Sequence, residues 1–249
     1  MKFILPGLFI IATVFSCGGK NTSSNVESPG KEKTGKDKAL EIGADLLQDK
    51  KPLKALNMYL NGFHFYNGNM KGQMEAHHYC HQVNDELIQC IIYDGNDADA
   101  KIMGIEYIVS ERIFKSLPQE ERKLWHSHRY EVKSGSLIAP GIPQAAEHEL
   151  MEKLVTTYGK TFHTWHTDKD LVLPMGHPMV MMGFTEEGQL EDSLLTQRDQ
   201  RFGISTAEKK QNREDIPVSP ILPGADAWKK NQIKQLTITD DYKGVLSHH

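Results

Sequence analysis

The sequence lacks an apolar run of the roughly 20 residues that a membrane-spanning helix needs. It also lacks an excess of positive charge: 29 Lys and Arg stand against 33 Asp and Glu, a formal net charge of −4. The basic footprint of a nucleic-acid-binding protein is therefore absent. No phosphate-binding loop, dinucleotide fingerprint, HExxH or GxSxG motif occurs, and these are the common signatures of nucleotide-binding proteins, zinc proteases and serine hydrolases. Three cysteines in 249 residues are too few for a disulfide scaffold, so the composition indicates an ordinary globular protein.

The first 17 residues resemble an export signal. Lys2 is followed by an apolar stretch from Phe3 to Phe15, which has the length of the hydrophobic region of a signal peptide. Ser16 and Cys17 come next, and a small residue directly before a cysteine at this place resembles the lipobox of bacterial lipoproteins. This resemblance predicts cleavage before Cys17 and acylation of its side chain with fatty acids such as palmitate. An ordinary secretory signal and an uncleaved anchor are the alternatives.

The rest of the chain divides by composition. Residues 18–38 contain a single large aliphatic residue, Val26, and such a segment cannot bury enough apolar surface to fold alone. We therefore predict four parts: a signal peptide (1–16), a lipidated cysteine with a flexible tether (17–38), one folded domain (39–228) and a C-terminal tail (229–249).

Apolar periodicity predicts the elements of the folded domain. Helices are expected over 39–48, from Pro52 through Leu60 and Phe63 to Asn67-Gly68, over 111–117, from Pro118 to Trp125 and over 143–158. Strands are expected over 75–83, 87–93, 101–109, 126–138, 161–167 and 177–184, and the signal weakens after residue 186. Strands mixed irregularly with helices predict a single α+β domain with a largely antiparallel sheet and flanking helices.

Two cysteines fall in a predicted hairpin. If its turn centres on Asp85, Cys80 lies directly opposite Cys90 and Tyr79 lies opposite Ile91. Opposed Cα atoms in antiparallel strands are about 4.5–5.5 Å apart, which is within disulfide range.

Histidines are the sharpest sign of chemistry, with 12 in the chain. His126 and His128 would leave the same face of the predicted strand 126–138, and two adjacent imidazoles can chelate a divalent metal ion. A helix over 74–83 would instead place His77 and His81 one turn apart. The residues that tertiary contacts could add to the pair are His77, His78, His81, His163, Glu106 and Asp168. Histidines that are hydrogen-bonded within a sheet are the structural alternative.

Two weaker hypotheses remain. Met175, His177, Met179 and Met181 alternate, and a row of Met and His can bind Cu(I), although such a row more often packs in a core. Cys80 with His78 on the same strand face is a candidate nucleophile and base.

Several long motifs carry a family resemblance. They are EAHHYC (75–80), QCIIYD (89–94), IEYI (105–108) with LWHSHRYEVKSG (124–135), and YGKT (158–161) followed by HTW (163–165). In this order they resemble the oil-body-associated protein family, a domain of unknown function found in plants, bacteria and fungi. The resemblance covers about residues 52–228.

The resemblance implies association with a lipid surface, but it implies no particular reaction or cofactor. Plant members associate with lipid bodies, and no catalytic residue or cofactor can be carried over. The cysteine pair also occurs in intracellular members, where thiols stay reduced, so the pairing of Cys80 with Cys90 is left open. Because this chain begins with a lipoprotein signal, we expect it in a bacterial cell envelope, attached to the outer membrane or cell surface and facing the periplasm or the exterior.

The function expected from the sequence is therefore a non-enzymatic binding or structural module at a lipid surface. Its partners would be the membrane, through the lipidated N-terminus, and a lipid or small-molecule ligand, with no nucleic acid. The alternative is a metal-binding protein or a metal-dependent enzyme that uses the histidine cluster. The sequence does not decide whether the chain is an enzyme.

Overall fold

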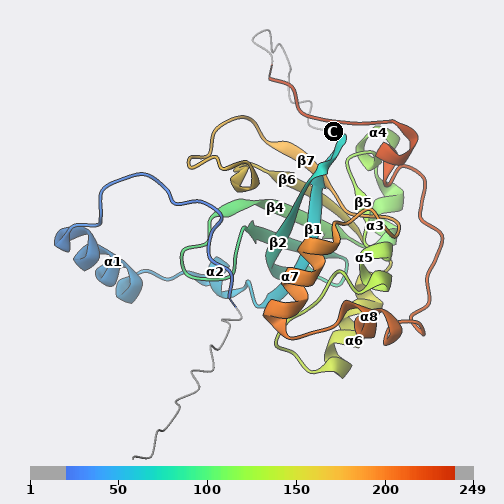
Figure 1. Cartoon of the computed structure of the whole chain (residues 1–249), viewed down its shortest axis with the longest axis horizontal. Helices are drawn as coiled ribbons and strands as arrows, with labels where there is room; N and C mark the ends of the chain where they lie inside the picture. The colour runs from blue at the N-terminus through green and yellow to red at the C-terminus, as the bar shows by residue number, and fades with distance from the viewer. Residues whose placement is uncertain (1–20, 239–249) are drawn as a thin grey trace, which may run out of the picture.

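A computed structural model describes residues 21–238, so the predicted signal peptide and Cys17 lie outside the described residues. Six antiparallel strands form a closed barrel (Figure 1). They are β1 (Met58–Tyr66), β2 (Asn69–Asn84), β3 (Leu87–Tyr93), β4 (Ile102–Val109), β6 (Tyr158–His163) and β7 (Met179–Met182). The pairings β4–β6 and β1–β7 close the ring. The predicted α+β class with an antiparallel sheet is confirmed, and the closed barrel is more specific than the sheet that the sequence predicted.

The hairpin of β2 and β3 has the predicted register. Cys80 pairs with Cys90, and Tyr79 pairs with Ile91, which excludes the alternative helix over 74–83. The two cysteine sulfur atoms are 2.01 Å apart, and this disulfide crosses the hairpin. Both cysteines are buried in a core cluster with side chains such as Leu60.

The predicted helix from Pro52 to Asn67-Gly68 is wrong. Only α2 (Lys51–Lys54) is helical there, and β1 follows it. One face of β1 lines the barrel and the other packs under a helix, so both faces are buried and the apolar residues do not alternate. Asn67-Gly68 is the turn of a β1–β2 hairpin rather than a helix stop, with Gly68 at φ +91°.

The predicted strand 126–138 is also wrong beyond its first two residues. Only β5 (His126–Ser127) is a strand, and it pairs with the start of β6. The chain then forms α5 (Arg129–Ser134), which ends at Gly135 with φ +81°. A glycine in the left-handed region directly after the last turn is a common helix stop.

The remaining helices cover the barrel mainly on one side (Figure 1). They are α3 (Glu111–Ser116), α4 (Gln119–Arg122), α6 (Gln144–Leu154), α7 (Asp192–Phe202) and α8 (Thr206–Gln211), with 3₁₀ turns at Thr167–Lys169 and Ala227–Lys230. Apolar side chains of α7 pack on the outward face of β1 at Phe63 and Phe65. By contrast, α1 (Gly35–Leu47) stands apart from the barrel and has no buried residue. Within residues 21–238, no helix combines the length and apolarity required to cross a bilayer.

Both ends of the folded domain extend beyond the predicted boundaries. Part of the expected tether, residues 22–26, is hydrogen-bonded to the loop after β3. In the expected tail, the Gln235 side chain bonds the backbone of Asn67 and Val180. Short polar segments can dock through backbone hydrogen bonds without an apolar core of their own, which composition does not reveal.

Candidate metal centre

Seven titratable side chains gather inside one end of the barrel. Alternation along the strands turns one side chain from each of β1, β2, β4 and β6 inward, and β5 and α5 supply the others. All seven are less than 5% exposed. They are His64, His78, Glu106, His126, His128, Glu131 and His163, and we call them the barrel cluster.

Glu106 is the centre of the barrel cluster. Its Oε1 lies 3.2 Å from Nε2 of His128 and 3.4 Å from Nε2 of His126. Its Oε2 lies 2.9 Å from Nε2 of His78 and 3.9 Å from Nε2 of His64. Four imidazoles from separate parts of the chain therefore point a ring nitrogen at one carboxylate.

Hydrogen bonds do not account for these contacts. Both ring nitrogens of His78 and of His126 lack a hydrogen-bond partner with suitable geometry, as does Oε2 of Glu131. Buried polar groups are nearly always paired, so this set of unpaired buried atoms requires an explanation. Two groups of three each bring candidate ligand atoms within 4.8 Å of one another: His64, Glu106 and His126, and His126, His128 and Glu131.

The hydrogen bonds of His128 show why a cation fits. The Thr157 hydroxyl donates to the Leu154 carbonyl at 2.7 Å, so it accepts from Nδ1 of His128 at 2.8 Å. In a neutral ring, Nε2 then carries a lone pair, and this lone pair faces the Glu106 carboxylate at 3.2 Å. A proton or a metal ion between these two atoms would satisfy both of them.

Burial keeps most of these imidazoles neutral. It lowers the pKa of His163 to about 3 and the pKa of His64 well below its ordinary value. Burial also lowers the pKa of His128, against the opposing effect of Glu106. Burial alone would raise the pKa of Glu106, but its close contacts with His126, His128 and His78 hold the pKa well below its usual value. His126 differs, because burial alone would lower its pKa but Glu106 and Glu131 raise it above the usual value. A metal ion bound there would displace a proton from this ring.

Two glycines leave room for the barrel cluster. A Cβ on Gly159 would lie 2.0 Å from Oε1 of Glu106 and 2.7 Å from Nε2 of His128. A Cβ on Gly183 would lie 2.7 Å from Oε2 of Glu131. Any side chain at either position would occupy the space that the ligand atoms use.

The sequence-predicted residues divide into two groups. The structure brings together His78, His126, His128, Glu106 and His163. The Nδ1 of His77 instead bonds Tyr59 Oη at 2.7 Å, and Nδ1 of His81 bonds the Ala55 carbonyl at 3.1 Å. Asp168 accepts from Tyr66 Oη at 2.5 Å.

Sequence reasoning missed two members of the barrel cluster. His64 lay in the segment that was predicted to be a helix, so the direction of its side chain toward the barrel interior could not be predicted. Glu131 lay in the predicted strand 126–138, which is in fact helical from Arg129 to Ser134. The period-two spacing of Leu60, Gly62 and His64 within β1 was the available signal.

The two weaker hypotheses lose their geometric basis. Met175 and His177 are exposed, whereas Met181 is buried in the core, so the predicted Met/His row does not form one site. Cys80 is fully buried and its sulfur is bonded to Cys90, which leaves no thiolate for nucleophilic attack.

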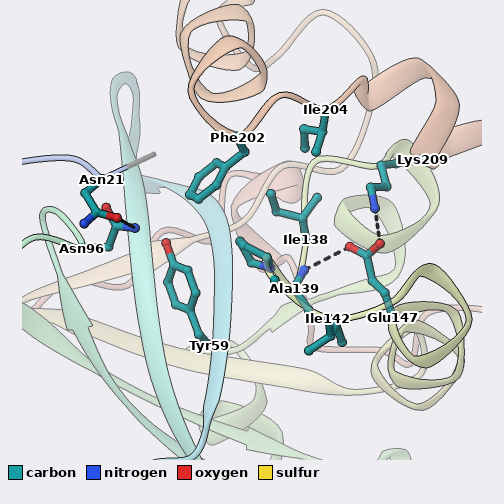
Figure 2. A pocket seen from close by; sticks show the side chains of 12 residues that line it. Asn21, Tyr59, Asn96, Ile138, Ala139, Ile142, Glu147, Phe202, Ile204 and Lys209 are labelled. Carbon is teal, nitrogen blue, oxygen red and sulfur yellow. Dashed lines mark hydrogen bonds and ion pairs between the residues drawn. The ribbon is translucent and has the colours of Figure 1, made fainter. Parts of the chain in front are cut away.

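Space beside the barrel cluster is small. An internal cavity of about 10 Å³ is lined by buried residues that include His78, Glu106 and His128. A larger surface cavity of about 310 Å³ lies outside the barrel, between Tyr59, Phe202 and Ile142 (Figure 2). The inner cavity has room for about one ion or water molecule.

Comparison with known proteins identifies the family. A family model described as "Protein of unknown function (DUF1264)" matches residues 50–217. Oil body-associated protein 1B of Arabidopsis thaliana is 39% identical over 88% of this chain and 92% of its own length. Oil body-associated protein 1A of Zea mays is 42% identical over 84% of this chain and 89% of its own length. No solved structure matches. The chain therefore belongs to the family of oil body-associated proteins, whose biochemical function is unknown.

Proposed function

We propose that the barrel binds one divalent first-row transition-metal ion between Glu106 and the imidazoles that converge on it, which include His78, His126 and His128. The observation that carries this proposal is the contact of Glu106 with the Nε2 of His128, whose proton the Thr157 hydrogen bond fixes on the other nitrogen. Imidazole and carboxylate ligands favour ions such as Zn²⁺, Fe²⁺ or Mn²⁺. His64 and Glu131 flank these ligands, and His163 contacts His64 at 3.3 Å.

The proposed ion has a structural role. Its ligands come from β2, β4, β5 and the residue that begins α5, so one ion would tie the barrel wall to the helix beside it. The 10 Å³ cavity leaves no room for an organic substrate next to the ligands. This supports a non-enzymatic centre whose binding energy stabilises the fold.

Metal content tests the proposal directly. The full chain, incubated with Zn²⁺, Fe²⁺ or Mn²⁺ and freed of excess ion, is expected to retain about one ion per chain by elemental mass spectrometry. The double variant His126→Ala/His128→Ala should retain less than about a tenth of that amount. Glu106→Gln keeps the shape of the side chain, removes its charge, and should weaken binding at least about tenfold.

His148 provides the matched control. It lies on α6 and contacts Asp215 at 3.0 Å near the surface, so His148→Ala should retain the full metal content. Absence of metal from the folded wild-type chain with all three ions would refute the proposal. Equal metal content in the wild type and in folded Glu106→Gln would refute the ligand assignment.

A second function is proposed from the relatives: association with a lipid surface. Their names associate them with oil bodies, and we propose that this chain reaches a bacterial envelope membrane through acylated Cys17. The signal-like N-terminus supports this location.

Acylation can be tested by metabolic labelling. Bacterial cells that express the full chain with labelled palmitate should incorporate label into the protein, and Cys17→Ser should abolish it. The Ser16→Ala variant keeps a small residue before the cysteine and serves as the control that retains label. Incorporation into Cys17→Ser equal to the wild type would refute acylation at this site.

A further inference from the structure

Helix α1 has an apolar face that nothing in residues 21–238 covers. Leu40, Gly43 and Leu47 follow one another at the spacing of one helix face, and Leu46 lies beside Gly43 at its edge. Leu40 is 62% exposed, and Leu46 and Leu47 are 82% and 83% exposed. Leu46 and Leu47 are the most exposed of the large apolar side chains in residues 21–238.

The opposite face of α1 is acidic and the helix has a defined start. Asp37, Glu41 and Asp45 repeat every four residues along it. The Thr34 side chain accepts from the Asp37 backbone N–H, and the Asp37 carboxylate accepts from the Thr34 backbone N–H. Even with such a cap, an isolated helix of this length is marginal in water. A partner for the apolar face would stabilise it.

The chain before α1 is fastened to the barrel. The Thr22 backbone N–H donates to Oδ1 of Asn96 at 2.6 Å, and its carbonyl accepts from the backbone N–H groups of Asn96 and Asp97 at 2.9 and 3.1 Å. The Ser24 hydroxyl donates to the Asp94 carboxylate at 2.8 Å. We call residues 22–26 the N-terminal latch.

The loop after β3 is shaped for this latch. A Cβ on Gly95 would lie 2.2 Å from the Thr22 carbonyl oxygen, so only glycine allows the backbones to approach this closely. Val26 at the end of the latch is 7% exposed. The latch and α2 therefore fix both ends of the segment between them, residues 27–50, which contains α1.

The latch limits the distance between this end of the barrel and the point at which the chain attaches to the membrane. Cys17 precedes Thr22 by five residues, which span at most about 18 Å when fully extended. In the alternative of an uncleaved anchor, the apolar segment ends at Phe15, two residues earlier. In both cases the latch brings this end of the barrel, with α1 beside it, close to the bilayer surface.

We propose that α1 lies in the interface of the membrane that holds the N-terminus, with Leu40, Leu46 and Leu47 among the acyl chains. The latch orients the barrel so that α1 faces the lipid. The inference rests on the proposed lipid attachment and is independent of the metal centre. An amphipathic helix with one apolar face and one charged face is the form that binds at such interfaces.

Depth-dependent quenching tests the proposal on the acylated full chain. Cys17 is acylated and Cys80 is bonded to Cys90, so a thiol-reactive fluorophore labels only an added cysteine. Leu47→Cys samples the apolar face of α1, and Asp45→Cys on the same helix is the matched control. Val83→Cys samples the opposite end of the β2–β3 hairpin.

The labelled chains are bound to mixed phosphatidylethanolamine–phosphatidylglycerol vesicles that carry nitroxide-labelled lipid. Quenching at position 47 should exceed quenching at position 45 at least about threefold, and position 83 should be unaffected. Gly95→Ala should displace the latch and reduce the contrast between positions 47 and 45.

Each contrary result has a separate meaning. Equal quenching at positions 47 and 45 on chains that float with the vesicles would overturn the proposed place of α1. So would a dimer in solution that shields position 47, because the occupant of the apolar face would then be a second copy. Failure of the wild-type chain to float would refute the lipid attachment itself.

Discussion

Gly159→Ala is expected to abolish the proposed metal binding and to lower the free energy of unfolding by about 3 kcal/mol, the upper end of the usual cost of overpacking. The added Cβ would lie 2.0 Å from Oε1 of Glu106 and 2.8 Å from Cε1 of His126. Strand β6 cannot retreat, because its first residues are hydrogen-bonded to β4 on one side and β5 on the other. Glu106 must therefore move, and the ligand set moves with it.

Thermal unfolding and metal content together check this result. A loss of that size corresponds to a fall of roughly 6–12 °C in Tm for a domain of about 200 residues. Gly43→Ala adds the same methyl group in α1, where no atom lies within 4 Å, and should leave Tm unchanged or slightly higher. A Gly159→Ala chain with wild-type Tm and metal content would show that the close packing around Glu106 is mistaken.

Glu147→Leu is the second substitution with a large expected effect. The Glu147 carboxylate is 3% exposed and accepts from the Ala139 backbone N–H at 3.1 Å and from Arg213 at 3.2 Å. Figure 2 shows it reaching Lys209 beside the surface cavity as well. Arg213, only 2% exposed, also donates to the carbonyls of Val132 and Leu137 at 2.9 and 2.8 Å.

Loss of the carboxylate would leave the Arg213 guanidinium buried without its counter-ion. Breaking a buried ion pair from one side typically costs about 3–5 kcal/mol, and urea denaturation should show a loss of this order. Glu149→Leu is the matched control, because Glu149 lies on the same helix and is exposed, and its effect should stay within about 0.5 kcal/mol. Similar losses in the two variants would mean that Glu147 is not part of a buried network.

The β2–β3 hairpin was predictable because its pattern is local. Turn residues and alternation fix a register, and the predicted position of Cys80 opposite Cys90 followed from that register alone. The Ser110 cap of α3 was predictable for the same reason. Strand β1 was not, since both of its faces are buried and its alternation is hidden. Closure of the sheet into a barrel depends on the pairings β4–β6 and β1–β7, which join distant segments.

The candidate centre was only partly predictable. The number and spacing of the histidines led to the prediction of His126 and His128 as candidate ligands, but the geometry expected for this pair was wrong. They were taken to share a strand face, whereas His128 is the residue that begins α5. Glu106 was named only beside Asp168 as a possible carboxylate ligand, because its central position appears only when β1, β2 and the segment from β5 to α5 fold around it. The orienting contact with Thr157 depends on tertiary structure and has no sequence signature.

Closure of the barrel also affects how copies of this chain behave when crowded. In residues 21–238 each of the six barrel strands has a neighbour on both sides, so the long exposed edge of an open sheet is absent. Exposed edges recruit strands from other molecules and can start fibre growth. A protein concentrated on a two-dimensional surface meets its own copies often, and a sheet without such an edge resists polymerisation under those conditions.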